Sequence, residues 1–202
     1  MYIIGITGGT GAGKTSALRA LRSLGALALD CDAIYHGLLS GNAALKAELG
    51  ERFAGVLRDG VIDRAILGGI VFNDPAALLD LNSITHKYVS AEIEKRLAEW
   101  EAQGGKVAAI DAIALIESGR GKNCDVVVGV LAPVEARISR IMNRDRITRE
   151  QAESRVNAQK PDSFFRENCD HILEDTFSTP GEYIDHCKKF FTQIIGGFDN
   201  AG

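Results

Sequence analysis

The sequence of 202 residues lacks long hydrophobic runs, an excess of positive charge and paired cysteines. Its longest apolar runs, 107–116 and 126–132, are too short to cross a bilayer and favour buried strands. A net charge of −4 argues against a nucleic-acid partner, and we expect no membrane partner. The composition, 46% hydrophobic and 25% charged, is that of an ordinary globular protein.

The four cysteines, Cys31, Cys124, Cys169 and Cys187, are scattered, without a C-x-x-C pair or a histidine at metal-ligand spacing. We therefore expect reduced thiols in or near the core of a cytoplasmic protein. The N-terminus shows no charged region followed by an apolar region, so no signal peptide is expected. Internal repeats and low-complexity segments are not visible, and the oligomeric state cannot be inferred.

Apolar runs that alternate with helical patterns predict an α/β fold with a parallel sheet covered by helices on both faces. The expected strands are 2–7, 26–29, 107–111, 126–132 and 171–173. The expected helices are 15–24, 42–53, 63–71, 75–103, two helices within 134–162, and 183–195. Thr148 and Gln151 predict a capping box at the second of the paired helices, and Gly196-Gly197 predicts the end of the last helix.

One motif carries phosphate chemistry. Gly8-x-x-x-x-Gly13-Lys14-Thr15 lies between the first strand and the first helix and matches a P-loop. Glycines let backbone N–H groups turn toward phosphate oxygens, and the helix N-terminus adds positive charge. We expect Lys14 to bind the β- and γ-phosphates and Thr15 to bind Mg²⁺. The expected ATP-binding residues in this motif are Gly9, Thr10, Gly11, Ala12, Gly13, Lys14, Thr15 and Ser16.

The P-loop alone does not define the reaction. A GTPase needs an Asn-Lys-x-Asp segment, which is absent, and LLSGN at 38–42 lacks the second glycine of an ABC signature. Phosphoryl transfer to a small molecule is therefore favoured, with an acidic side chain that orients or deprotonates the acceptor hydroxyl. Asp30 and Asp32 both follow the strand expected beside the P-loop strand; the alternative for each is a helix cap.

A second feature relevant to phosphoryl transfer is the arginine-rich segment 134–162. Arg137, Arg140 and Arg144 recur at spacings of three and four and share one helix face. A solvated basic face is one interpretation of this pattern. In a net-acidic chain with a P-loop, a lid that closes over the triphosphate and excludes water is favoured.

We expect one P-loop kinase domain with two inserted parts. Segment 33–103 has helical patterns and no convincing strand, which indicates a helical acceptor-binding subdomain. Segment 134–162 is the arginine-rich lid. The core then consists of 1–32, 104–133 and 163–202.

With these residues assembled, the chain resembles the dephospho-CoA kinases along nearly its whole length. The matching segments are GITGGTGAGKT at 5–15, LDCD at 29–32, DGVIDRAILGGIVF at 59–72, LNSITH at 81–86, RISRIMNRD at 137–145 and RVNAQ at 155–159. Many enzymes share the P-loop, whereas the third segment followed by the fourth is far more specific. The resemblance implies ATP-dependent phosphorylation of the ribose 3′-hydroxyl of dephospho-CoA, the last step of coenzyme A biosynthesis.

The resemblance also implies residue roles. Asp32 would be the catalytic carboxylate, assisted by Lys14 and Arg140, and Arg140 and Arg144 would be the lid residues that bind ATP. On the substrate side it implies Asp32, Arg64, His86 and Asp111; a structural role is the alternative for His86. Mg²⁺ would be bound by Thr15, with Asp32 or Asp111 through water. ATP and dephospho-CoA are thus the expected small-molecule substrates, while the ATP or GTP preference and the arginine that contacts adenine stay open.

Two departures from the family pattern affect the acceptor side. The family has His-Pro where this chain has His86-Lys87, and Asp-x-Pro-Leu-Leu-x-Glu where it has DAIALIE at 111–117. Without proline, the backbone after Asp111 is freer and can extend helically. Two alternatives therefore stay open: a small-molecule or nucleoside kinase with another acceptor, and a nucleotide-binding regulator that has lost catalysis.

Overall fold

The structure is a computed structural model that describes residues 1–199, with side chains described through residue 197. It contains two compact units. The first, called the sheet unit, consists of residues 1–29 and the chain from Trp100 onward; the second, called the helical unit, is Asp30–Glu99. Within residues 1–199, no helix combines the length and the apolar character needed to span a membrane.

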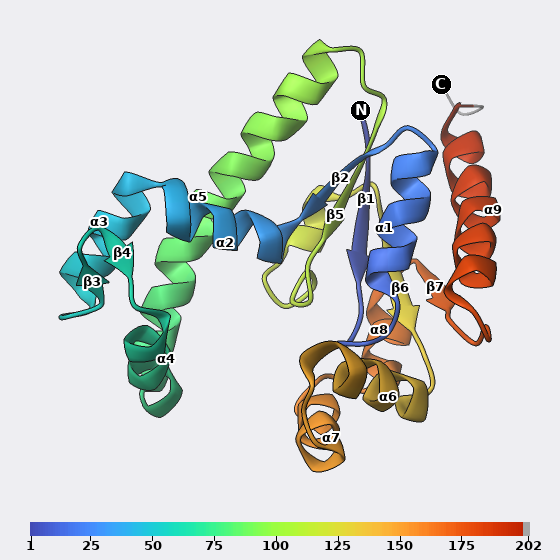
Figure 1. The fold of residues 1–202 in the computed structure, drawn as a ribbon. Helices are drawn as coiled ribbons and strands as arrows, with labels where there is room; N and C mark the ends of the chain where they lie inside the picture. Colours follow the sequence, from blue (N-terminus) through green and yellow to red (C-terminus); the bar gives the residue numbers. More distant parts are fainter. Residues whose placement is uncertain (200–202) are drawn as a thin grey trace. The chain divides into compact units, whose positions relative to one another are not determined.

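The sheet unit is built on five parallel strands (Figure 1). They are β1 (Tyr2–Thr7), β2 (Leu27–Asp30), β5 (Val107–Asp111), β6 (Val126–Leu131) and β7 (His171–Glu174). Their order is β2-β5-β1-β6-β7, and Ile4 of β1 lies opposite Ala109 of β5 and Val126 of β6. The expectation that β2 lies beside the P-loop strand is therefore wrong, because β5 separates β2 from β1. All six residues of β6 are buried, as its apolar run predicts for a strand covered on both faces.

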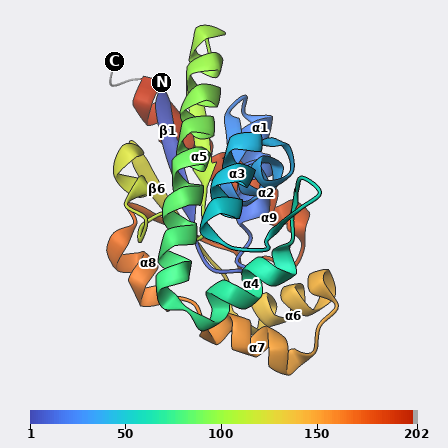
Figure 2. The same cartoon turned by 90° about the vertical axis from the view of Figure 1, so that its left-hand side faces the viewer.

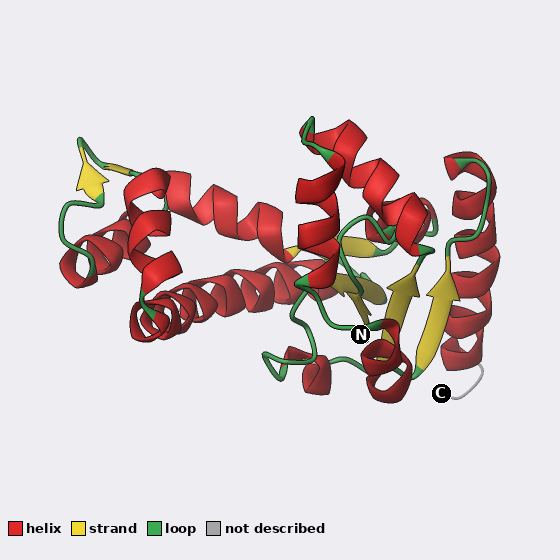
Figure 3. Cartoon of the chain, turned by 90° about the horizontal axis from the view of Figure 1, so that it is seen from below, coloured by secondary structure: helices red, strands yellow, loops and turns green. Residues whose placement is uncertain are grey.

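Helices α1 (Lys14–Ser23) and α9 (Pro180–Asp199) pack together on one face of this sheet (Figure 1). Leu21 of α1 and Phe191 of α9 join Ile4 in the main core. The other face lies against α8 (Asp162–Asn168), the turns at 112–119 and the short helix η1 (Arg120–Asn123). Figure 3 shows helices on both sides of the strands, as the sequence predicts.

The helical unit has a core of its own, formed by residues such as Leu45, Leu49 and Phe53. Its elements are α2 (Cys31–Gly41), α3 (Ala43–Arg52), β3 (Leu57–Arg58), β4 (Val61–Ile62), α4 (Arg64–Asn73) and most of α5 (Pro75–Ala102), the long helix in Figure 2. The expectation of no strand in this segment is wrong. Asp59 and Gly60 have φ values of 50° and 75° and connect β3 to β4, and Asp-Gly is a common turn in two-residue hairpins.

Two helix predictions also need correction. Helix α9 starts three residues before residue 183 and continues through Gly196-Gly197 to Asp199. Ile194 and Ile195 pack against the main core, and this packing outweighs the roughly 1 kcal/mol by which each glycine disfavours a helix. Helix α2 was not expected, although Asp30 caps its N-terminus by accepting a hydrogen bond from the Ala33 N–H at 2.9 Å.

The arginine-rich segment forms α6 (Val134–Asp145) and α7 (Arg149–Asn157). The predicted capping box is present: Thr148 and Gln151 exchange side-chain-to-backbone hydrogen bonds at the start of α7. Ile141 and Ala152 are fully buried in a small cluster between the two helices. Both helices belong to the sheet unit; the use of this segment as a lid, and the assignment of core, insertion and lid, stay predictions.

Candidate active site

The P-loop connects the end of β1 to the start of α1, the context that the motif requires. Gly8, Gly11 and Gly13 have φ values of 139°, 77° and 109°, which side-chain-bearing residues rarely adopt. A Cβ on Gly8 would lie 2.2 Å from the Val130 carbonyl oxygen, so both backbone angle and space require glycine there. Gly13 occupies the N-cap position of α1 and offers no side-chain cap, which leaves this helix end suited to an anion.

Lys14 lies across this loop. Its half-buried ammonium group donates hydrogen bonds to the carbonyl oxygens of Gly8 at 2.8 Å and Gly9 at 3.3 Å. The charge is therefore fixed at the start of α1, where backbone dipoles also favour negative charge. Positive charge from both sources at one place is the arrangement expected for phosphate binding.

Arg137 of α6 also binds the backbone of the loop. Its side chain is only 5% exposed; Nε donates to the Thr10 carbonyl oxygen at 3.1 Å and Nη2 to Oε1 of Gln159 at 2.7 Å. The same oxygen of Gln159 accepts the Thr10 N–H at 2.8 Å. Burial lowers the pKa of Arg137, and the charge of Asp162 opposes this shift. Sequence reasoning did not include Arg137 or Gln159 among the site residues, although both occur in segments that resemble the family.

Arg140, one turn further along α6, makes a second contact with the P-loop. Its Nη1 donates to the Gly11 carbonyl oxygen at 2.9 Å, and its Nη2 lies 2.8 Å from Oδ2 of Asp175. Asp175 follows β7 directly and is 5% exposed. Desolvation raises the pKa of this carboxyl group, and the charge of Arg140 opposes the increase. The structure thus places Arg140 against the loop and against Asp175, a partner that the sequence did not identify; binding of ATP by Arg140 stays a prediction.

Arg144 is not held against the P-loop. This exposed side chain pairs with the neighbouring Asp145 at 2.7 Å, and Asp145 also pairs with Arg155. Hydrogen bonding from Arg144 lowers the pKa of Asp145. Arg149 pairs with Glu135 at 2.8 Å. These outer arginines therefore form a charge-compensated network in the conformation observed.

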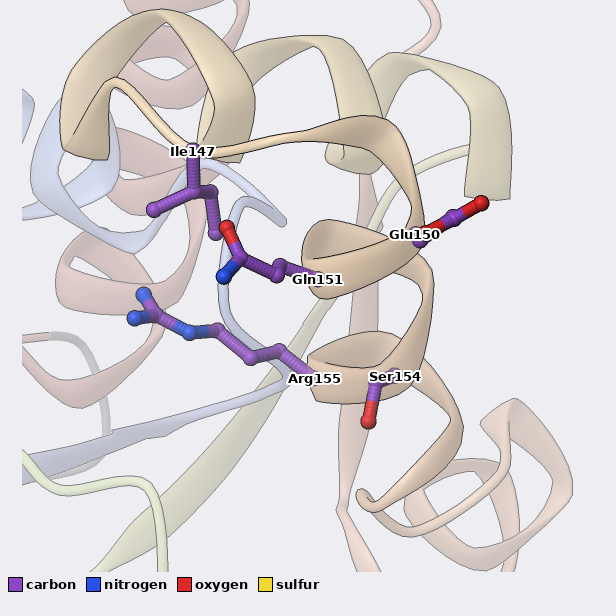
Figure 4. A pocket seen from close by; sticks show the side chains of 5 residues that line it. All are labelled: Ile147, Glu150, Gln151, Ser154 and Arg155. Atoms are coloured by element: carbon purple, nitrogen blue, oxygen red, sulfur yellow. The ribbon is translucent and has the colours of Figure 1, made fainter.

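A hollow of about 420 Å³ lies along α7 and the loop before it. Figure 4 shows Gln151 and Arg155 extending to the same side of α7, below Ile147. Glu150 and Ser154 complete its lining. All of its lining residues lie within segment 134–162, the predicted lid.

Oxygen ligands suited to Mg²⁺ occur near the phosphate-binding end of the sheet. Thr15 lies in the first turn of α1, and Asp111 is the buried last residue of β5, opposite Ile6 in the neighbouring P-loop strand. Among residues 1–199, no group of three or more His, Cys, Asp or Glu side chains is arranged to hold a metal. This donor set fits Mg²⁺ held mainly by phosphates and water, the usual arrangement in kinases. The DAIALIE segment after Asp111 forms turns rather than extending as a helix.

The remaining expected residues lie in the helical unit. Asp32 is exposed in the first turn of α2, whereas Asp30 is engaged as the helix cap. Tyr35 lies one turn beyond Asp32 in α2. Burial raises the pKa of Tyr35, and the charge of Arg64, the first residue of α4, opposes part of this increase. The charge of Arg64 thus acts on a residue of the helix that carries Asp32. His86 is exposed on α5.

Lys87, which stands where the family has proline, ties α5 to α3. Its ammonium group lies 2.6 Å from Oε2 of Glu48, which also accepts a hydrogen bond from the Tyr88 hydroxyl at 2.7 Å. Hydrogen bonds from Lys87 and Tyr88 lower the pKa of Glu48. The departure at Lys87 thus has a local structural role within the helical unit.

The family model described as dephospho-CoA kinase matches residues 2–180 of this chain. The chain belongs to the dephospho-CoA kinase family. A dephospho-CoA kinase of Dehalococcoides mccartyi is 38% identical over 165 residues, covering 81% of this chain and 83% of the relative. One of Latilactobacillus sakei is 33% identical over 197 residues, covering 97% and 95%.

Solved structures support the same family assignment. TT1252 from Thermus thermophilus is 30% identical with a TM-score of 0.82, covering 95% of this chain and 96% of that one. Dephospho-CoA kinase from Campylobacter jejuni is 27% identical with a TM-score of 0.70, covering 96% and 98%. A shikimate kinase from Acinetobacter baumannii, 17% identical with a TM-score of 0.54 and covering 98% and 94%, shares the fold alone. The predicted P-loop kinase fold is thereby confirmed.

The close packing around Gly13 predicts an unequal response to two alanine substitutions. A Cβ on Gly13 would lie 2.9 Å from both Oδ2 of Asp175 and the Tyr183 ring, whereas Gly25, which also has positive φ, has nothing within 4 Å. Gly25→Ala should cost about 1–2 kcal/mol through backbone strain, and Gly13→Ala about 1–3 kcal/mol more through overpacking. Urea unfolding followed by the fluorescence of Trp100, which lies in the sheet unit, measures both costs. Equal destabilisation would contradict the packing described for Gly13.

Proposed function

We propose that this protein transfers the γ-phosphoryl group of ATP to the ribose 3′-hydroxyl of dephospho-CoA, producing ADP and CoA. As a member of the dephospho-CoA kinase family, it is an ATP-dependent kinase that acts in coenzyme A biosynthesis. The observation that carries the proposal is the P-loop with Lys14 and Arg140 against it, in a chain that the family matches over residues 2–180.

On the ATP side, the P-loop residues 9–16 bind the triphosphate. Lys14 lies on the carbonyl oxygens of the loop, so a small movement of its flexible side chain brings the ammonium group onto β- and γ-phosphate oxygens. Arg140 adds a second positive charge beside Gly11. Arg144 reaches the nucleotide only if its pairing with Asp145 is exchanged for phosphate, which we assign to lid closure.

Thr15, together with Asp111 or Asp32 through water, would hold Mg²⁺. Bound there, Mg²⁺ would supply positive charge to neutralise the negative charge that develops on the phosphates during transfer. The hydroxyl and carboxylate groups of these residues are ligands that Mg²⁺ prefers.

On the acceptor side, Asp32 orients the 3′-hydroxyl and accepts its proton. Asp32 follows the end of β2, and the carboxyl ends of parallel strands, including the P-loop strand β1, lie at one edge of a sheet. Asp30 already caps α2, whereas Asp32 is exposed in the same turn, so its side chain stays accessible to an acceptor. We assign Arg64 and His86 to binding of the acceptor.

The acceptor is tested by a coupled ADP-release assay with dephospho-CoA and a panel of nucleosides and nucleotides. We expect dephospho-CoA to give the highest kcat/KM by at least about tenfold, a difference of roughly 1.4 kcal/mol in transition-state binding. If another member of the panel is preferred, the proposed acceptor is wrong, but the assignment as a kinase stands. The absence of turnover with every acceptor, together with normal ATP binding, would favour the regulatory alternative.

The two aspartates after β2 offer a matched test of the catalytic carboxylate. Asp32→Asn should lower kcat by about 10²- to 10⁴-fold with ATP affinity largely unchanged, because it removes a general base without changing side-chain size. Asp30→Asn is the control, since asparagine caps helices as well as aspartate does. Steady-state kinetics with both variants decide the assignment; near-normal turnover of Asp32→Asn would remove it from the mechanism.

A further inference from the structure

Asp175 occupies an unusual position for an acidic residue. It follows the last residue of β7, its side chain is 6% exposed, and its Oδ2 lies 2.8 Å from Nη2 of Arg140. A carboxylate so deeply buried requires a compensating cation. Arg140 is the cation described in contact with it, so the two side chains constrain each other.

Asp175 also lies against the P-loop itself. The position of a Cβ on Gly13 would be 2.9 Å from its Oδ2. The carboxylate is therefore confined between the last glycine of the loop and the guanidinium group, and its backbone N–H donates to the Leu131 carbonyl oxygen at 2.7 Å. The side chain is therefore restricted by the loop and by its burial, and the backbone of Asp175 is held against β6.

Arg140 would otherwise have considerable conformational freedom. Its side chain is 37% exposed, and it reaches the Gly11 carbonyl oxygen from another part of the chain. The two contacts to Gly11 and Asp175 use two of the five N–H donors of a guanidinium group and fix its plane. Donors that remain on a guanidinium group held in this way can bind ATP without first ordering the side chain.

We propose that Asp175 is a positioning residue that fixes the guanidinium group of Arg140 beside the P-loop and thereby increases the affinity for ATP. This inference rests on the proposed function only in taking Arg140 as an ATP-binding residue. It does not depend on the identity of the acceptor, because the predicted effect is on nucleotide binding.

The test is a double-mutant cycle on the full chain, with a non-hydrolysable ATP analogue as the probe in calorimetric titrations. Asp175→Asn should raise the Kd of the analogue by about 5- to 50-fold, within the range of coupling between contacting residues. Arg140→Ala should raise it by at least as much. The double variant should bind no more weakly than Arg140→Ala alone, because Asp175 acts through Arg140.

Glu174→Gln is the matched control. This neighbouring carboxylate pairs with Arg166 at the surface, with side chains 47% and 51% exposed, and its loss should leave the Kd unchanged. Multiplicative effects of Asp175→Asn and Arg140→Ala, or an unchanged Kd in Asp175→Asn, would overturn the proposal. If the ion pair between Asp175 and Arg140 were purely structural, its loss would change the unfolding temperature but would not give these non-additive effects on the Kd of the ATP analogue.

A second variant covers the case in which Asp175→Asn does not fold. Asp175→Glu retains the negative charge but displaces it by one methylene group, so it should raise KM for ATP while KM for the acceptor stays within about twofold. If KM for ATP and KM for the acceptor change equally, or if neither changes, the proposal that Asp175 positions Arg140 is contradicted. If dephospho-CoA is not the acceptor, the titrations still test this inference, so the two failures are distinguishable.

Discussion

The attachment of α6 to the P-loop is the constraint on which the rest of the nucleotide site depends. A P-loop needs backbone angles that only glycine adopts readily, and a glycine-rich loop is flexible unless other groups hold it. Arg137 and Arg140 supply that restraint through the carbonyl oxygens of Thr10 and Gly11. Because both guanidinium groups bind the backbone of the loop, they define its shape and place positive charge around it. The first turns of α6 thus hold the P-loop in the conformation observed, and Gln159, which follows α7, holds it as well.

The acidic residues divide into distinct roles by burial and partner. Asp30 is used as a helix cap, and Asp175 is buried against an arginine. Asp32 is exposed in the first turn of α2, where its oxygens stay accessible. Asp111 lies at the buried end of the strand beside β1. A carboxylate that must contact a substrate needs accessible oxygens, and this requirement separates Asp32 from its neighbour Asp30.

The sequence predicted the features that arise from local patterns. The P-loop and the capping box at Thr148 depend on residues close together in the chain, and the parallel sheet was predicted from local apolar runs that alternate with helical patterns. The hairpin at Asp59-Gly60 was missed although its turn signal is local, because its strands have only two residues each. The burial of Arg137 and the pairing of Arg140 with Asp175 could not be predicted, because they join segments far apart in sequence. Arginine spacing indicates a shared helix face but does not specify which carbonyl or carboxylate each side chain meets.

The proposed reaction transfers the γ-phosphoryl group of ATP, bound at the P-loop, to one particular hydroxyl group. Phosphorus NMR of the product formed from ATP and dephospho-CoA tests it most directly, since the position of the new phosphomonoester identifies the oxygen that attacked. The account predicts a single new phosphate on the ribose 3′-oxygen, with one ADP formed for each product molecule. A phosphate at any other position, or ADP formation without a phosphorylated acceptor, would contradict it.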